Sequence, residues 1–185
     1  MRKLAFAVAA LAIAGLTIVA TTALANRGHG GNGGNRFSAK LIGYEETPSE
    51  STPGRGTFRA TVNGSTIHYV LHYQGFEAAE GDTLFSHIHF GQRGVAGGVA
   101  AFLCGGGGKP PCTPVQGTFE GDIHSSDIVG PTGQGIAPGE MDEVIAAMRK
   151  GYTYANVHTN LNPAGLIRGQ IHRGFGHGHG GSGHH

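Results

Sequence analysis

The segment GTFRATVNGSTIHYVLHYQG, residues 56–75, decides the fold class of this chain. Apolar and polar residues alternate along both halves of the segment, and this period of two is that of a β-strand with one buried face. Asn63-Gly64 lies between the two alternating runs, which is a strong short-range sign of a β-hairpin. We therefore expect two antiparallel strands, at about 56–64 and 65–75.

Short segments of the same character continue on both sides of this hairpin, separated by turns rich in glycine and proline. One helix is expected at 139–150, because Pro138 precedes it, acidic residues fill its first turn and basic residues end it before Gly151. The pattern predicts an all-β fold, an antiparallel Greek-key-like β-sandwich or flattened barrel of about eight strands with one short inserted helix. The further strands are expected at 37–43, 84–91, 99–104, 115–123, 152–159 and 165–172.

The two ends of the chain differ in composition from its middle. Residues 1–25 have a basic start, an apolar run and a small-residue end, which predicts a secretory signal peptide and a secreted, periplasmic or extracellular protein. An uncleaved membrane anchor is the alternative, and no later stretch is apolar enough to span a bilayer. Residues 26–35 are expected to be a Gly-rich linker, 36–173 the folded domain and 174–185 a Gly/His-rich tail with an affinity of its own for metal ions.

Charge and cysteine content narrow the range of functions. The whole chain has 13 Lys and Arg residues against 12 Asp and Glu residues, and two of the basic residues lie in the predicted signal peptide. The mature chain therefore has no basic excess, and we expect no nucleic-acid partner. Cys104 and Cys112 are close in a chain expected to be secreted, so a disulfide is predicted, with a cysteine-ligated metal site as the alternative.

Histidines are placed on several of the expected strands. His87 and His89 in LFSHIHFG are two residues apart, so both side chains point to the same side of a strand. His158 lies on a later strand, and Arg168 follows it by ten residues. If the apolar residues of each strand face the core, the opposite faces point outward. These outward faces carry His72, His87, His89, His158 and Arg168.

Three imidazoles with an open position suit a transition-metal ion, with copper preferred here to zinc. The expected ligands are His87, His89 and His158, with His72 as a fourth, or His124 in its place. The alternative is that these histidines form hydrogen bonds across strands under a covering loop, without metal. Arg168 is the candidate catalytic residue, because a cation on the same side attracts a small anion toward a metal; a structural arginine is the alternative.

Four segments carry a resemblance to a known family: residues 37–48, 56–76, 86–104 and 151–171. Their sequences are FSAKLIGYEETP, GTFRATVNGSTIHYVLHYQGF, SHIHFGQRGVAGGVAAFLC and GYTYANVHTNLNPAGLIRGQI. In this order they resemble the CHRD domain, first described in chordin and also found as a stand-alone secreted module in bacteria. The resemblance covers about 36–172 and implies an all-β sandwich.

A second likeness involves residues 62–91, VNGSTIHYVLHYQGFEAAEGDTLFSHIHFG, which look like the strand, turn and HxH copper motif of Cu,Zn superoxide dismutase. That likeness implies that His87, His89 and His158 are copper ligands and that Arg168 guides an anion. The His-rich zinc loop of that family has no counterpart in this sequence. We therefore expect a secreted CHRD-type protein with a copper-type site. The alternatives are a non-catalytic module with structural histidines that binds an extracellular or envelope protein, and a dismutase-like redox enzyme.

Overall fold

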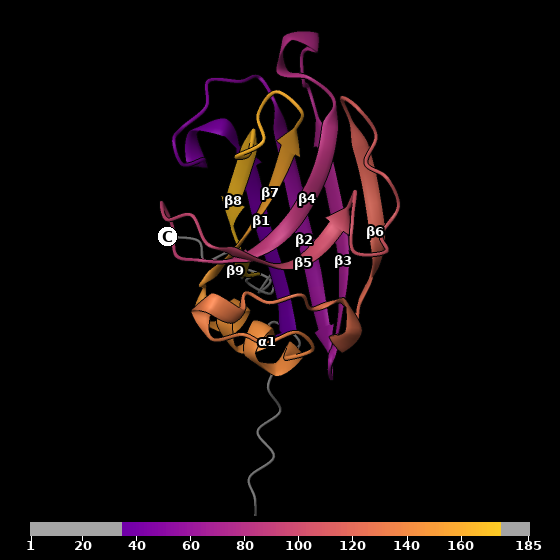
Figure 1. Cartoon of the computed structure of the whole chain (residues 1–185), viewed down its shortest axis with the longest axis vertical. Helices are drawn as coiled ribbons and strands as arrows, with labels where there is room; N and C mark the ends of the chain where they lie inside the picture. Colours follow the sequence, from indigo (N-terminus) through magenta and orange to yellow (C-terminus); the bar gives the residue numbers. More distant parts are fainter. Residues whose placement is uncertain (1–34, 175–185) are drawn as a thin grey trace, which may run out of the picture.

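The computed structural model describes residues 35–174, and Figure 1 shows their arrangement. The predicted signal peptide, nearly all of the predicted linker and nearly all of the predicted Gly/His-rich tail lie outside the described residues. Within the described part of the chain, no helix is both long and apolar enough to cross a membrane.

Nine strands form one antiparallel sheet with the order β5-β4-β7-β8-β1-β2-β3-β6, and β9 pairs with β1. The two ends of this path, β5 and β6, contact each other, so the sheet curls into a nearly closed, flattened barrel (Figure 1). This confirms the predicted fold class. The strands are β1 (Arg36–Ile42), β2 (Arg55–Asn63), β3 (Thr66–Gln74), β4 (Thr83–Phe90), β5 (Gly98–Cys104), β6 (Gly117–Ile123), β7 (Thr153–Thr159), β8 (Ile167–Gln170) and β9 (His172–Arg173).

The predicted hairpin is confirmed, with a small shift of its turn. Asn63 is the last residue of β2 and pairs with Thr66 of β3, so Gly64 and Ser65 form the two-residue loop. Gly64 has a φ of 60°, and only glycine has a positive φ in the described part of the chain. A positive φ at the first loop position alone is the pattern of a type II′ turn, which matches the twist of the paired strands.

The seam between β5 and β6 is bridged by other groups. The hydroxyl of Tyr69 on β3 donates to the carbonyl of Leu103 (2.7 Å), and the backbone N–H of Val129 donates to the carbonyl of Ala100 (2.9 Å). Both acceptors belong to β5, an end strand of the sheet path. These bonds satisfy some of the backbone carbonyls of β5. Such groups on an unpaired edge strand are otherwise free to pair with another chain.

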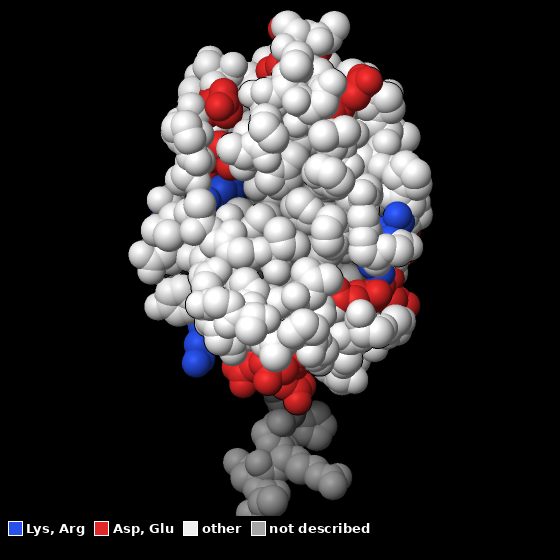
Figure 2. Space-filling view, in the orientation of Figure 1, with Lys and Arg blue, Asp and Glu red and all other residues white. Residues whose placement is uncertain are grey.

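One end of the barrel is covered by the helix α1 (Met141–Lys150), as Figure 1 shows. The acidic residues Asp142 and Glu143 lie in its first turn and basic residues lie in its last, as predicted. Figure 2 shows acidic side chains gathered at this end of the barrel. Gly151 ends the helix with a φ of 76°, a left-handed conformation that favours glycine. Short 3₁₀ helices lie in the loops: η2 (Gly43–Glu45), η3 (Ala78–Glu80), η4 (Ser125–Asp127) and η5 (Thr132–Gln134).

The disulfide between Cys104 and Cys112 is present, as predicted, and closes a loop with a sequence separation of 8. We expect replacement of both cysteines by alanine to lower the free energy of unfolding by about 2–3 kcal/mol, because the unfolded chain regains the freedom of this loop. Urea denaturation of both proteins measures the difference. A loss well below 1 kcal/mol would contradict this account of the loop.

Candidate metal centre

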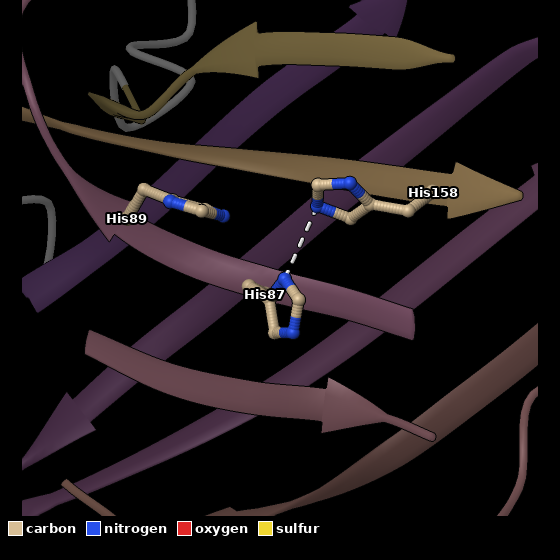
Figure 3. Close-up of side chains that lie close together, drawn as sticks. All are labelled: His87, His89 and His158. Carbon is tan, nitrogen blue, oxygen red and sulfur yellow. Dashed lines mark hydrogen bonds between the residues drawn. The ribbon is translucent and has the colours of Figure 1, made fainter. Parts of the chain in front are cut away.

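Three predicted histidines meet on one face of two neighbouring strands. His87 and His89 lie on β4, and His158 lies on β7, which pairs with β4. In this register His158 is opposite Phe85, so it is a diagonal neighbour of His87. Figure 3 shows the far nitrogen of His89 pointing toward the other two rings. Within the described residues, this is the one group of three or more His, Cys, Asp or Glu side chains placed to share an ion.

The distances between the ring nitrogens can be compared with those between histidine ligands of one metal ion. Nδ1 of His87 lies 3.1 Å from Nε2 of His158, and one nitrogen from each of the three rings lies within 4.8 Å of the others. Two nitrogens bound to the same ion at about 2.0–2.1 Å lie no more than about 4.2 Å apart. The pair formed by His87 and His158 already meets this limit, and the nitrogen of His89 lies within 4.8 Å of both, close to it.

Backbone carbonyls orient two of the three rings. Nδ1 of His89 donates to the carbonyl of Gly97 (2.8 Å), and Nδ1 of His158 donates to the carbonyl of Pro163 (3.0 Å). A proton on Nδ1 leaves the lone pair on Nε2, and such contacts commonly fix the tautomer of metal-binding histidines. In the metal-free protein, His87 donates its Nδ1 proton to Nε2 of His158, which also lies 2.9 Å from the side-chain amide of Asn156.

Burial keeps the three rings neutral. Each histidine is 7% exposed. Desolvation, with repulsion from the neighbouring rings, lowers the pKa of His87 to about 3. Desolvation likewise lowers the pKa of His89 to about 4 and that of His158 below its ordinary value. Neutral imidazole is the form that binds metal, so no proton competes for these nitrogens at neutral pH.

One nitrogen of the cluster has no protein partner. Nε2 of His89 is buried and makes no hydrogen bond within the described part of the molecule. A buried polar atom without a partner costs about 1–3 kcal/mol. Because the proton of His89 lies on Nδ1, the orphaned atom is a lone pair directed at the two other histidines. The donor set therefore fits a transition-metal ion.

Aromatic side chains surround the cluster. The ring of His87 meets the ring of Phe102 edge-on at 4.5 Å between centroids and stacks with Phe85 at 5.8 Å. The ring of His89 stacks on Tyr154 at 4.7 Å with an interplanar angle of 7°. These contacts limit the directions that the imidazoles can take and exclude most of the water around them.

The prediction that this face looks outward was wrong for four residues. His87, His89, His158 and Arg168 do lie opposite the apolar core, but all four are buried. The reason is that loops cover this face. The covering loop, residues 91–97, contacts β4, β7 and β8, and residues 44–49 lie beside it. In the β7–β8 connection, Pro163 contacts His158. Alternation along a strand gives the face of a side chain and contains no information on a loop that covers this face.

Arg168 holds the covering loop. It is 1% exposed, and its guanidinium donates to the carbonyls of Gln92 (2.9 Å) and Val95 (3.0 Å) and to the hydroxyl of Thr47 (3.1 Å). Its central carbon lies 3.4 Å over the ring of Tyr154. Tyr154 is thus contacted by Arg168 from β8 and by His89 from β4. These contacts support the structural alternative for Arg168, and the anion-guiding role stays a prediction.

Glu46 lies near this arginine in a buried position. Burial raises its pKa to about 7, although the charge of Arg168 acts in the opposite direction. Its Oε1 has no hydrogen-bond partner within the described residues. The carboxylate packs against the backbone of Gly165, where a Cβ would lie 2.4 Å from Oε1. Glu46 was missed at the sequence level, because a glutamate in a loop gives no sign that it is buried.

The two further histidines considered as ligands lie elsewhere. His72 is on β3, far along the sheet path from β4 and β7, and its Nδ1 lies 3.0 Å from the hydroxyl of Thr118. His124 precedes η4, and its Nδ1 lies 3.5 Å from the hydroxyl of Thr66. The structure brings neither of them to the cluster.

Asn156 is a site residue to which the sequence analysis assigned no role. It lies on β7, and its Oδ1 is 2.9 Å from Nε2 of His158. Its position two residues before His158 was the available signal. No signal in the sequence marks the carbonyls of Gly97 and Pro163 as partners of the histidines, because every residue carries a backbone carbonyl.

The fold and the cluster together define a small β-barrel domain with a candidate three-histidine metal centre. The sequence profile of the CHRD domain matches residues 37–171, and the chain belongs to the CHRD domain family. No curated protein and no solved structure matches the chain. CHRD domains occur in extracellular proteins.

Proposed function

We propose that this CHRD-domain protein is a secreted module that binds one transition-metal ion through His87, His89 and His158, with copper preferred to zinc. One observation carries the proposal: three buried, neutral imidazoles converge, and the lone pair of one of them has no protein partner. Imidazole nitrogen suits both metals, and comparable sites bind divalent copper more tightly than zinc. Secretion rests on the predicted signal peptide.

The chain performs three tasks in this proposal. The carbonyls of Gly97 and Pro163 hold the rings of His89 and His158 with their lone pairs inward. His87 gives up the hydrogen bond to His158 and offers Nδ1 in its place, with its proton moved to Nε2. The aromatic neighbours keep bulk water away. A copper ion bound there supplies one-electron redox chemistry, and three protein ligands leave a position open for a small ligand.

A second candidate function is a structural module that binds an extracellular or envelope protein. It is favoured by the direct hydrogen bond between His87 and His158 and by the carbonyl partners, which satisfy most of the ring nitrogens without an ion. In that case the histidines stabilise the packing of β4 on β7. The contacts of Arg168 give no support to a dismutase-like enzyme, so we do not propose one.

Metal uptake separates the two candidates. The experiment uses a full-length variant, the tail-substituted protein, in which His177, His179, His184 and His185 are alanine. We expect the tail-substituted protein to retain about one equivalent of copper after desalting. Adding His87→Ala and His89→Ala should abolish this retention, because only one of the three ligands is left. Elemental analysis measures the retained metal.

A matched control removes two histidines from the surface of β3, His68→Ala with His72→Ala. It changes the same number of imidazoles and should leave uptake unchanged, which also tests His72 as a fourth ligand. Full retention of copper by the His87→Ala, His89→Ala protein would contradict the metal site. A fall in melting temperature without any uptake by the parent would favour the structural module.

A further inference from the structure

The geometry points to a preference of this site for monovalent copper, Cu(I), over Cu(II) and Zn(II). The inference rests on the proposed metal site at His87, His89 and His158 and adds the oxidation state of its ion. It follows from the charges of the groups around the cluster and from their burial.

The donor set supplies no negative charge. All three ligands are neutral imidazoles, and within the described residues no carboxylate or thiolate joins the cluster. A Zn(II) or Cu(II) ion therefore keeps two full positive charges in a buried position, and a Cu(I) ion keeps one. In a continuum description the cost of burying an ion rises with the square of its charge, and that cost is large in a low dielectric.

The surroundings do not offset this cost. Phe85 and Phe102 pack on His87, and Tyr154 packs on His89. Aromatic and apolar neighbours of a metal site lower the local dielectric and set the redox potential. A second positive charge is therefore poorly solvated here.

A fixed cation acts in the same direction. Arg168 and His89 both stack on the ring of Tyr154, with the guanidinium carbon 3.4 Å and the imidazole centroid 4.7 Å from the ring centroid. A fixed positive charge this close repels a divalent ion more strongly than a monovalent one. The nearest buried acid, Glu46, is only partly ionised at neutral pH, because burial raises its pKa to about 7.

Preference for one oxidation state is equivalent to a shift of the reduction potential. In the step Cu(II) + e⁻ → Cu(I), the electron comes from an external reductant and no bond to the protein is broken. Each tenfold advantage in affinity for Cu(I) over Cu(II) raises the potential of the bound couple above that of the free couple by about 59 mV. A bound copper ion is then held in its reduced form.

The test measures affinities of the tail-substituted protein for the three ions alone. Cu(I) is titrated without oxygen against a chromophoric Cu(I) chelator, and Cu(II) and Zn(II) against chelators of known affinity. We expect Cu(I) to bind at least about tenfold more tightly than Cu(II), equal to a potential shift of about 59 mV, and more tightly than Zn(II). Equal or tighter binding of either dication overturns the inference and leaves the metal site standing. Absence of binding by all three ions overturns the proposed function itself.

A single substitution tests the charge argument. Asn156→Asp keeps the side-chain size and places a carboxylate where Oδ1 lies 2.9 Å from Nε2 of His158. We expect the Cu(I)/Cu(II) affinity ratio to fall at least about tenfold, because the added charge favours the dication. Asn63→Asp on the exposed β2–β3 hairpin is the matched control and should leave the ratio unchanged. An unchanged ratio in a folded Asn156→Asp protein overturns the inference; if that variant does not fold, the affinities of the parent decide.

Discussion

Replacing Arg168 by methionine is expected to lower the free energy of unfolding by about 3–5 kcal/mol, because each buried polar group left without its hydrogen-bond partner costs about 1–3 kcal/mol. Arg168 is 1% exposed, and its guanidinium is bonded to Thr47, Gln92 and Val95. Methionine fills part of the space but donates nothing, so buried carbonyls of the covering loop lose their partners. Glu46 also loses the cation that favours its charged form.

A matched control lies in the same loop. Arg93 pairs with Glu45 at the surface, and its side chain is 58% exposed. Arg93→Met removes an arginine of the same size from a solvated ion pair, so we expect a loss below about 1 kcal/mol. Urea denaturation of the two variants and the parent measures both values. Equal losses in the two variants would contradict the role of Arg168 as the anchor of the covering loop.

The same substitution has a consequence for metal binding. The covering loop contains Gly97, whose carbonyl orients His89, so Arg168→Met should weaken metal affinity by about 10–100-fold without touching a ligand. An arginine that only guides anions would leave both the stability and the metal affinity unchanged. Arg168 is therefore a positioning residue in our proposal, and the two readouts distinguish it from an anion guide.

The strands were predictable because most of them have one apolar and one polar face. Alternation placed β2 (Arg55–Asn63) and β3 (Thr66–Gln74) within about a residue of their ends, since burial alternates along both. The expected strand at 165–172 is divided into β8 and β9 around Ile171. β8 pairs with both β7 and β1, whereas β9 pairs with β1 alone. The side-chain pattern does not specify where a strand loses one of its two partners.

The site was predictable to the extent that it depends on side-chain direction. The spacing of His87 and His89 placed them on one face, but only the pairing of β4 with β7 brings His158 beside them. Outward-facing His72 has the same local pattern and lies on β3, away from the cluster. The pairing of strands depends on contacts between residues far apart in the chain, and these contacts cannot be deduced from a single sequence. The covering loop, the carbonyl partners and the burial of Glu46 are consequences of that assembly.

Acidification from pH 7 to pH 5 is expected to destabilise the metal-free protein through its histidines and to stabilise it through Glu46. Burial holds the pKa of His87 at about 3 and that of His89 at about 4 in the folded state, against 6.5 for an ordinary histidine. Below pH 6.5 the unfolded chain therefore binds protons that the folded chain does not. Stability falls as the pH falls, by about 2 kcal/mol for each of these two histidines over this range.

Glu46 has the opposite sign. Its pKa is raised from 4.5 to about 7 by burial, so the folded state binds a proton between these values that the unfolded state does not. Its contribution to stability is fully present below pH 4.5 and is lost as the pH rises through 7. Between pH 7 and pH 5 the contribution of Glu46 to the free energy of unfolding therefore increases by about 2 kcal/mol. The parent protein should show only part of the loss of stability caused by the histidines.

The variant Glu46→Gln separates the two contributions, because glutamine resembles the neutral acid and does not titrate. We expect this variant to lose at least about 4 kcal/mol between pH 7 and pH 5, about twice the loss of the parent. Adding His87→Ala and His89→Ala to it should remove most of this dependence. The remainder comes from His158, whose pKa is lowered by burial, and from His68, whose pKa is raised by its hydrogen bond with Asp122 and which therefore acts in the opposite direction. Urea denaturation across the pH range measures each curve. A flat curve for Glu46→Gln would mean that the histidines accept protons in the folded state. That result would contradict the neutral, buried cluster on which the metal site depends.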